Sequence, residues 1–154
     1  MAIKLLDLST LKRDLEIHKG HGTADEPRPP FVVLVRYLSR PTLVALQRET
    51  AAETGISEAD AAKKWAGHCI AGWSGLTPLI ARELNVPAGD ESAAADGFIP
   101  YDAEAAATLW HYANVNLFSA RITAFAFALL GTIEKEKDVS KNDSGALSAP
   151  NSTP

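Results

Sequence analysis

Side chains capable of nucleophilic or metal chemistry are few in this sequence. There is one cysteine, Cys69, and the four histidines, His18, His21, His68 and His111, are scattered without the HExxH-like spacing of zinc proteases. His68 and Cys69 are adjacent, so on a helix their side chains point about 100° apart and do not form a Cys–His dyad. A metal site made of His68, Cys69 and distant His111 is an alternative, but a buried cysteine that packs as a small hydrophobe is favoured.

Sequence motifs of enzymes are also missing. The chain contains no GxSxG nucleophile elbow, no GxxxxGK[ST] phosphate loop and no GxGxxG after a predicted strand. A single cysteine excludes an internal disulfide and leaves too few thiols for a typical structural zinc site. The sequence therefore predicts no catalytic, cofactor-binding or metal-binding residues, and a protein that is not an enzyme.

The composition predicts a soluble protein of one domain. The 154 residues are 46% hydrophobic and 22% charged, which is enough apolar material for one core. No apolar run approaches the roughly 20 residues that cross a bilayer, and residues 1–7 lack the features of a signal peptide. We therefore expect no membrane contact, and residence in the cytoplasm where the protein is made.

The charge is unevenly distributed. Residues 1–75 hold ten basic and nine acidic side chains, whereas residues 76–154 hold five basic and ten acidic ones, which gives the net charge of −4. Phosphate binding depends on clustered lysine and arginine. An acidic C-terminal half therefore argues against nucleic acid as the main partner.

The elements that would position any functional side chains begin with a strand. Residues 31–38 are rich in β-branched and aromatic residues and follow prolines, which predicts a strand with its partner within residues 3–18. Ser39 resembles an N-cap of a helix that runs to about Glu53 and stops at Gly55. Ser57 then caps a helix to about Ala71, and residues 72–76 break it.

Three further helices are expected. Thr77 and Pro78 can start a short one, the polar segment 87–97 is a loop, and Asp102 caps the next helix. Residues 114–116 are either a bend or a weak spot before the last helix. The inner stripe of the helix after Asp102 is predicted to be Leu109, Trp110, Ala113 and Leu117.

The fold class that results is mainly α, of the α+β type. We expect a single domain at residues 1–137, with a small N-terminal antiparallel β element at residues 1–38. A bundle of about four to five helices would follow at residues 39–137. Residues 138–154 are rich in charged and small polar residues, which predicts a disordered tail.

The last helix carries an apolar surplus. Phe118, Ile122, Phe125 and Leu129 repeat at helical spacing, and further apolar residues extend this face around the helix. Internal core is the favoured explanation for most of this surface, and self-association or a groove for a partner helix is the alternative. The residues predicted to bind a partner are Phe118, Ile122, Phe125, Phe127 and Leu130.

Residues 51–57 lie between two predicted helices and resemble the turn of a helix-turn-helix. In that motif the second helix would present its first residues, Glu58, Ala59 and Asp60, to DNA. Two of these are acidic, and only Lys63 and Lys64 follow. An ordinary helical hairpin with glycine and serine caps explains the same residues.

Three segments, in this order, resemble the tail assembly chaperones of long-tailed bacteriophages. Residues 35–40 (VRYLSR) are similar to the family's junction between a strand and its first helix. Residues 71–78 (AGWSGLTP) resemble its central W-x-G-L element, and residues 98–104 (FIPYDAE) its I-P-Y segment. The residues that carry the two later motifs are Trp73, Gly75, Leu76, Pro100 and Tyr101.

The resemblance covers about residues 32–135 and implies a function. A protein of this family binds the tape measure protein, recruits tail tube subunits during tail assembly in the host bacterial cytoplasm, and is absent from the finished virion. The chain departs from the family at Asp102, where serine is common, and in its long acidic loop at residues 85–97. A structural virion protein, such as a head–tail or minor tail component, is the alternative, and a helix-turn-helix regulator is less favoured.

Overall fold

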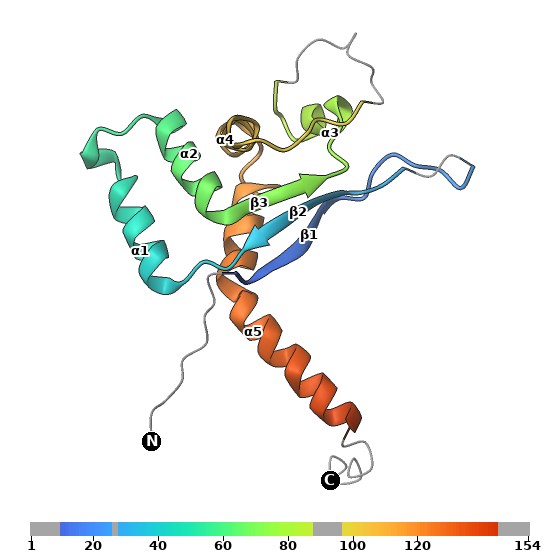
Figure 1. Ribbon diagram of the computed structural model, residues 1–154. Helices are drawn as coiled ribbons and strands as arrows, with labels where there is room; N and C mark the ends of the chain where they lie inside the picture. Colours follow the sequence, from blue (N-terminus) through green and yellow to red (C-terminus); the bar gives the residue numbers. More distant parts are fainter. Residues whose placement is uncertain (1–9, 26–27, 88–96, 145–154) are drawn as a thin grey trace, which may run out of the picture.

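A three-stranded antiparallel sheet in the order β1-β2-β3 lies at the centre of the molecule (Figure 1). The computed structural model describes residues 10–25, 28–87 and 97–144, with side chains described as far as residue 131. Strand β2 alternates between fully buried and half-buried residues, as expected when one face of a sheet covers a core. The strands are β1 (Lys12–His18), β2 (Phe31–Arg36) and β3 (Ile70–Ser74).

Strand β3 is the main correction to the predicted fold. The sequence predicts that β structure is confined to residues 1–38 and that residues 72–76 only interrupt a helix. Instead, α2 (Glu58–Cys69) passes directly into β3, which pairs with β2 so that Trp73 lies opposite Val33. The strand contains Gly72 and has no apolar–polar alternation, so its pairing with β2, rather than its own sequence pattern, makes it a strand.

Five α-helices and one 3-10 turn occur in the described parts of the chain. The predicted N-caps Ser39, Ser57 and Asp102 are confirmed, because each side-chain oxygen accepts a backbone N–H from the first turn. Thr77 caps the third helix in the same way. The remaining bounds are α1 (Arg40–Glu49), the 3-10 turn η1 (Ala52–Thr54), α3 (Pro78–Glu83), α4 (Ala103–Tyr112) and α5 (Ser119–Ser144).

Two helices end elsewhere than predicted. Helix α1 stops at Glu49 rather than Glu53, because the Thr50 hydroxyl donates to the carbonyl oxygen of Leu46 at 2.6 Å and the chain tightens into η1. Helix α5 runs to Ser144, through a segment rich in glutamate and lysine, which are good helix formers. The rest of the predicted tail, residues 145–154, lies outside the described residues, as do residues 88–96 of the predicted acidic loop.

The link between α4 and α5 is a true break in the helix. The side-chain oxygen of Asn114 accepts the backbone N–H groups of Asn116 at 2.9 Å and Leu117 at 3.3 Å, which closes an Asx-type turn. This turn confirms the predicted bend. It also leaves Leu117 44% exposed, so the prediction that Leu117 belongs to the inner stripe is wrong.

Helix α5 crosses behind the sheet and continues past its end (Figure 1). It is tied to β1 by Arg121, whose guanidinium donates to the carbonyl oxygens of Ile17 at 3.1 Å and Glu16 at 2.8 Å. The rings of Phe31 and Phe118 stack with their centroids 6.3 Å apart. The sheet and α5 therefore share one core, which positions the exposed face of α5 relative to the other helices.

Candidate protein-binding groove

An apolar groove of about 530 Å³ opens between α1, α2, α4 and α5. Its lining combines three large side chains on three different helices with the face of α5 that points away from the sheet. None of these lining residues is charged. They are Leu43, Trp65, Trp110, Val115, Ser119, Ala120, Thr123, Ala124 and Phe127.

The floor of this groove is a pair of tryptophans. Trp65 and Trp110 stack with ring centroids 6.2 Å apart and an interplanar angle of 11°. The indole N–H of Trp65 donates to the Thr50 hydroxyl at 3.0 Å, and Trp110 meets Phe118 edge to face at 6.3 Å. Because both rings are held by their neighbours, the groove is preformed rather than dependent on a partner.

One wall of the groove is a stripe along α5. Ala120, Thr123, Ala124 and Phe127 follow one another at intervals of three, one and three residues, the spacing of a single helix face. Phe127 is 47% exposed, and Val115, which lies in the turn after α4, is 62% exposed. Small side chains beside an exposed aromatic ring suit the close approach of another helix.

The structure separates the five predicted partner-binding residues into three groups by their burial. Phe118 and Ile122 are fully buried in the protein's own core, so they do not contribute to its surface. Phe125 is partly buried against that core, and Leu130 is half-buried. Only Phe127 of the five is both exposed and part of the groove. The core face of α5 packs on β1 and β2. Which residues of α5 are covered therefore depends on where the sheet lies.

The two motifs at residues 73–76 and 99–101 meet in space. The indole N–H of Trp73 donates to the carbonyl oxygen of Ile99 at 2.9 Å, and its ring meets Tyr101 edge to face at 5.1 Å. The backbone N–H of Ile99 donates to the carbonyl oxygen of Leu76 at 2.8 Å. Pro100 is exposed between them. These residues therefore fasten the segment before α4 to the end of β3.

Gly75 makes the turn that leaves β3. Its φ is 82°, and a Cβ at this position would overlap the carbonyl oxygen of Pro30. Both the left-handed backbone and the close approach require glycine here.

Cys69 is a buried structural residue. Its side chain is fully buried at the end of α2, and burial raises the pKa of the thiol to about 12. His68 is exposed and His111 is half-buried. Within the described residues, the only group arranged to hold a metal ion does not contain His68, Cys69 or His111.

Helix α2 lacks the surface expected of a DNA-reading helix. Glu58 and Asp60 are exposed in its first turn. The ammonium group of Lys64 lies 3.3 Å from the carboxylate of Glu49 on α1. This ion pair offsets one of the two lysine charges of α2. The helix also packs extensively against α4. The acidic side chains in the first turn of α2 would therefore repel the phosphates of DNA.

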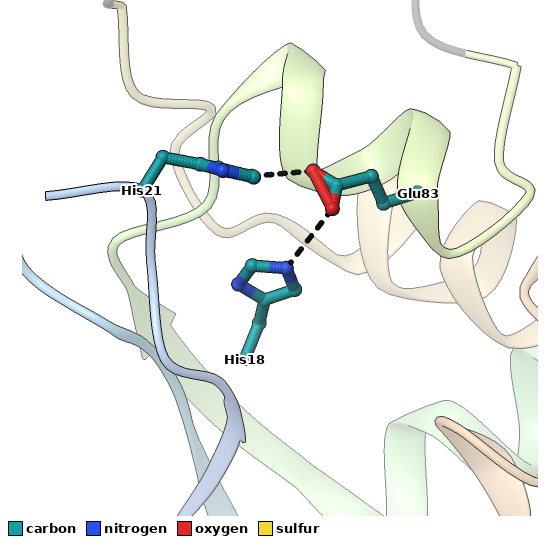
Figure 2. A group of neighbouring side chains, drawn as sticks. All are labelled: His18, His21 and Glu83. Atoms are coloured by element: carbon teal, nitrogen blue, oxygen red, sulfur yellow. Dashed lines mark hydrogen bonds and ion pairs between the residues drawn. The ribbon is translucent and has the colours of Figure 1, made fainter.

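Apart from the groove, His18, His21 and Glu83 form a cluster of side chains that the sequence did not predict. Figure 2 shows both imidazoles directed at the carboxylate of Glu83. His18 Nε2 lies 3.4 Å from Glu83 Oε1, and His21 Nε2 contacts Glu83 Oε2. The His-x-x-His spacing at residues 18–21 is a signal in the sequence, but Glu83 lies 65 residues beyond His18 and only the fold joins them.

Comparison of the chain with protein-family models, with curated proteins and with solved structures finds no match. In the described part of the chain, no helix combines the length and apolar character needed to cross a bilayer.

Proposed function

We propose that this protein is a tail assembly chaperone of a long-tailed bacteriophage. In this proposal it is not an enzyme, it acts in the host bacterial cytoplasm, and it binds the tape measure protein and recruits tail tube subunits. The three sequence segments that resemble this family support the proposal. Two of them, at residues 73–76 and 99–101, also form one packed unit in this fold.

The observation that carries the proposal is the apolar groove. Its tryptophan floor is rigid, its lining is uncharged, and Phe127 and Val115 stay exposed beside it. An amphipathic helix can lay an apolar face into such a groove, with i, i+3, i+4 and i+7 residues as anchors. The occupant proposed here is such a helix of the tape measure protein, whose long apolar stripes need shielding from water before the tail is built.

Co-expression tests the proposal directly. The full chain is produced with a helical fragment of the tape measure protein from the same phage, and soluble complex is recovered by size-exclusion chromatography. We expect the fragment to become soluble only with the chaperone. A fragment that stays insoluble, with no complex recovered, contradicts the assignment.

A matched pair of variants locates the binding surface. Phe127→Ala removes the exposed ring of the groove, whereas Phe98→Ala removes a ring that is 55% exposed on a different surface. We expect Phe127→Ala to weaken binding by at least about tenfold, as for an interface anchor, and Phe98→Ala to leave it unchanged. Equal losses would show that the groove is not the binding site. If a second copy of this chain occupies the groove, Phe127→Ala will instead change the molar mass by light scattering.

The alternative, a structural virion protein, makes a different prediction. A chaperone leaves the tail when assembly ends, so mass spectrometry of purified particles should find none of this chain. Stoichiometric amounts in the virion would favour the alternative.

A further inference from the structure

We propose that His18, His21 and Glu83 bind a divalent transition-metal ion of the zinc type. The three side chains each offer one ligand atom, and these atoms lie within 4.8 Å of one another. Two imidazoles and one carboxylate are a ligand set that zinc accepts, with a further position left for water or another ligand. The proposal is independent of the groove and of the proposed function.

The spacing suits a small tetrahedral ion. Ligand atoms about 2.0–2.2 Å from a tetrahedral zinc ion stand about 3.4 Å apart. His18 Nε2 and Glu83 Oε1 are 3.4 Å apart, and the two imidazole rings have centroids 4.9 Å apart. Small side-chain rotations of His21, which is 38% exposed, can bring its Nε2 to the same distance.

Ordered elements hold two of the ligands, and a glycine turn places the third. His18 is the last residue of β1 and pairs with Phe31 of β2, and Glu83 is the last residue of α3. Gly20 has a φ of 86°, and a Cβ there would come within 2.8 Å of the Pro29 carbonyl oxygen. This turn folds His21 back over His18, so the loop is shaped to bring the histidines together.

One hydrogen bond competes with the metal ion. The backbone N–H of Gly20 donates to His18 Nδ1 at 2.9 Å, so the neutral imidazole carries its proton on Nε2, which faces Glu83. A metal ion on Nε2 moves this proton to Nδ1, where it faces the Gly20 N–H. Metal binding therefore breaks this hydrogen bond and shifts the turn at residues 19–21.

The site would fasten the β1–β2 loop to α3. A bound ion would join two segments that are distant in the sequence and would stabilise the folded state by binding it in preference to the unfolded chain. His21 also lines a hollow of about 200 Å³ together with Thr77 and Phe98, so another ligand can approach from that side.

Titration of the full, untagged chain with zinc chloride tests the proposal. We expect calorimetry to give one ion per chain, with no binding of magnesium or calcium, which prefer oxygen ligands. His21→Ala and Glu83→Gln should each weaken zinc binding by at least about tenfold, and His68→Ala, which changes an exposed histidine elsewhere, should not. Equal zinc binding by all four proteins, or none by the wild type, overturns the site.

Nuclear magnetic resonance tests the site in the wild-type protein alone, so the result does not require any variant to fold. We expect the amide signal of Gly20 to shift as zinc is added to the wild-type protein, with saturation at one equivalent, because its hydrogen bond to His18 Nδ1 is lost. A Gly20 signal unchanged at saturating zinc would place the ion elsewhere and overturn the proposal.

Discussion

At the residue scale, the backbone at Gly75 is the most constrained position of the motif at residues 73–76. Alanine would have to adopt a φ of 82° and would clash with the carbonyl oxygen of Pro30. We expect Gly75→Ala to lower the free energy of unfolding by about 3 kcal/mol or more, measured by urea denaturation.

Gly55 provides the matched control for this substitution. Its φ is 76°, but a Cβ there would meet nothing within 4 Å. Gly55→Ala should cost only about 1 kcal/mol, the penalty of the left-handed backbone alone. Similar losses for both variants would show that contact with Pro30 does not contribute.

Cys69 makes stability depend on pH in the alkaline range. Its pKa rises from 9.0 in the unfolded chain to about 12 in the folded protein, because burial disfavours the thiolate. The neutral thiol stabilises the fold fully below pH 9, and this contribution is lost as the pH rises from about 9 to about 12. The slope should reach about 1.4 kcal/mol per pH unit.

Cys69→Ala isolates this effect from other groups that titrate at alkaline pH. We expect urea denaturation at several pH values to show a shallower fall in stability for the variant than for the wild type. If the free energy of unfolding falls equally with pH in both proteins, ionisation of the Cys69 thiol does not destabilise the fold, and burial does not raise its pKa.

At the element scale, one face of α5 belongs to the protein core and another face lines the proposed binding groove. Leu129 is fully buried, whereas Phe127 is 47% exposed and lines the groove. Leu129→Ala should therefore lower the free energy of unfolding by about 2–5 kcal/mol, and Phe127→Ala by less than about 1 kcal/mol. Thermal and urea denaturation measure both. Equal losses would identify Phe127 as core and remove it from the proposed binding surface.

Some helices and strands could be predicted from the sequence, and others could not. Ser39, Ser57 and Asp102 each cap a helix by accepting the backbone N–H of the residue three positions further on, so their role is visible locally. The strand at residues 31–36 is identifiable from its β-branched residues. Strand β3 lacks such a pattern and exists because β2 offers it an unpaired edge.

At the scale of the whole molecule, charge sets the expected partners. The net charge is −4, and the acidic excess lies in the C-terminal half. Because DNA binding depends on clustered basic charge and this chain is acidic overall, we expect no retarded band in a gel-shift assay with duplex DNA at moderate salt. A retarded band that depends on Lys63 and Lys64 would revive the helix-turn-helix interpretation.

The sequence by itself determined what short-range physics controls. Helix caps, the β-branched strand, the helical repeat of α5 and the exclusion of a disulfide all follow from residues that interact with near neighbours or from simple counts. The sequence also indicated Phe127 as one of five candidate surface residues. It could not separate Phe127 from Phe118, because both belong to an apolar helix and only the packed sheet decides which side is covered.

Only the tertiary structure decided the long-range arrangements. Strand β3 joined the sheet, Trp65 and Trp110 formed a groove floor from two helices, and Glu83 came to lie beside His18 and His21. Each of these depends on contacts between segments far apart in the chain. Such contacts form when the whole core closes, because a local pattern does not specify which distant surface it will meet.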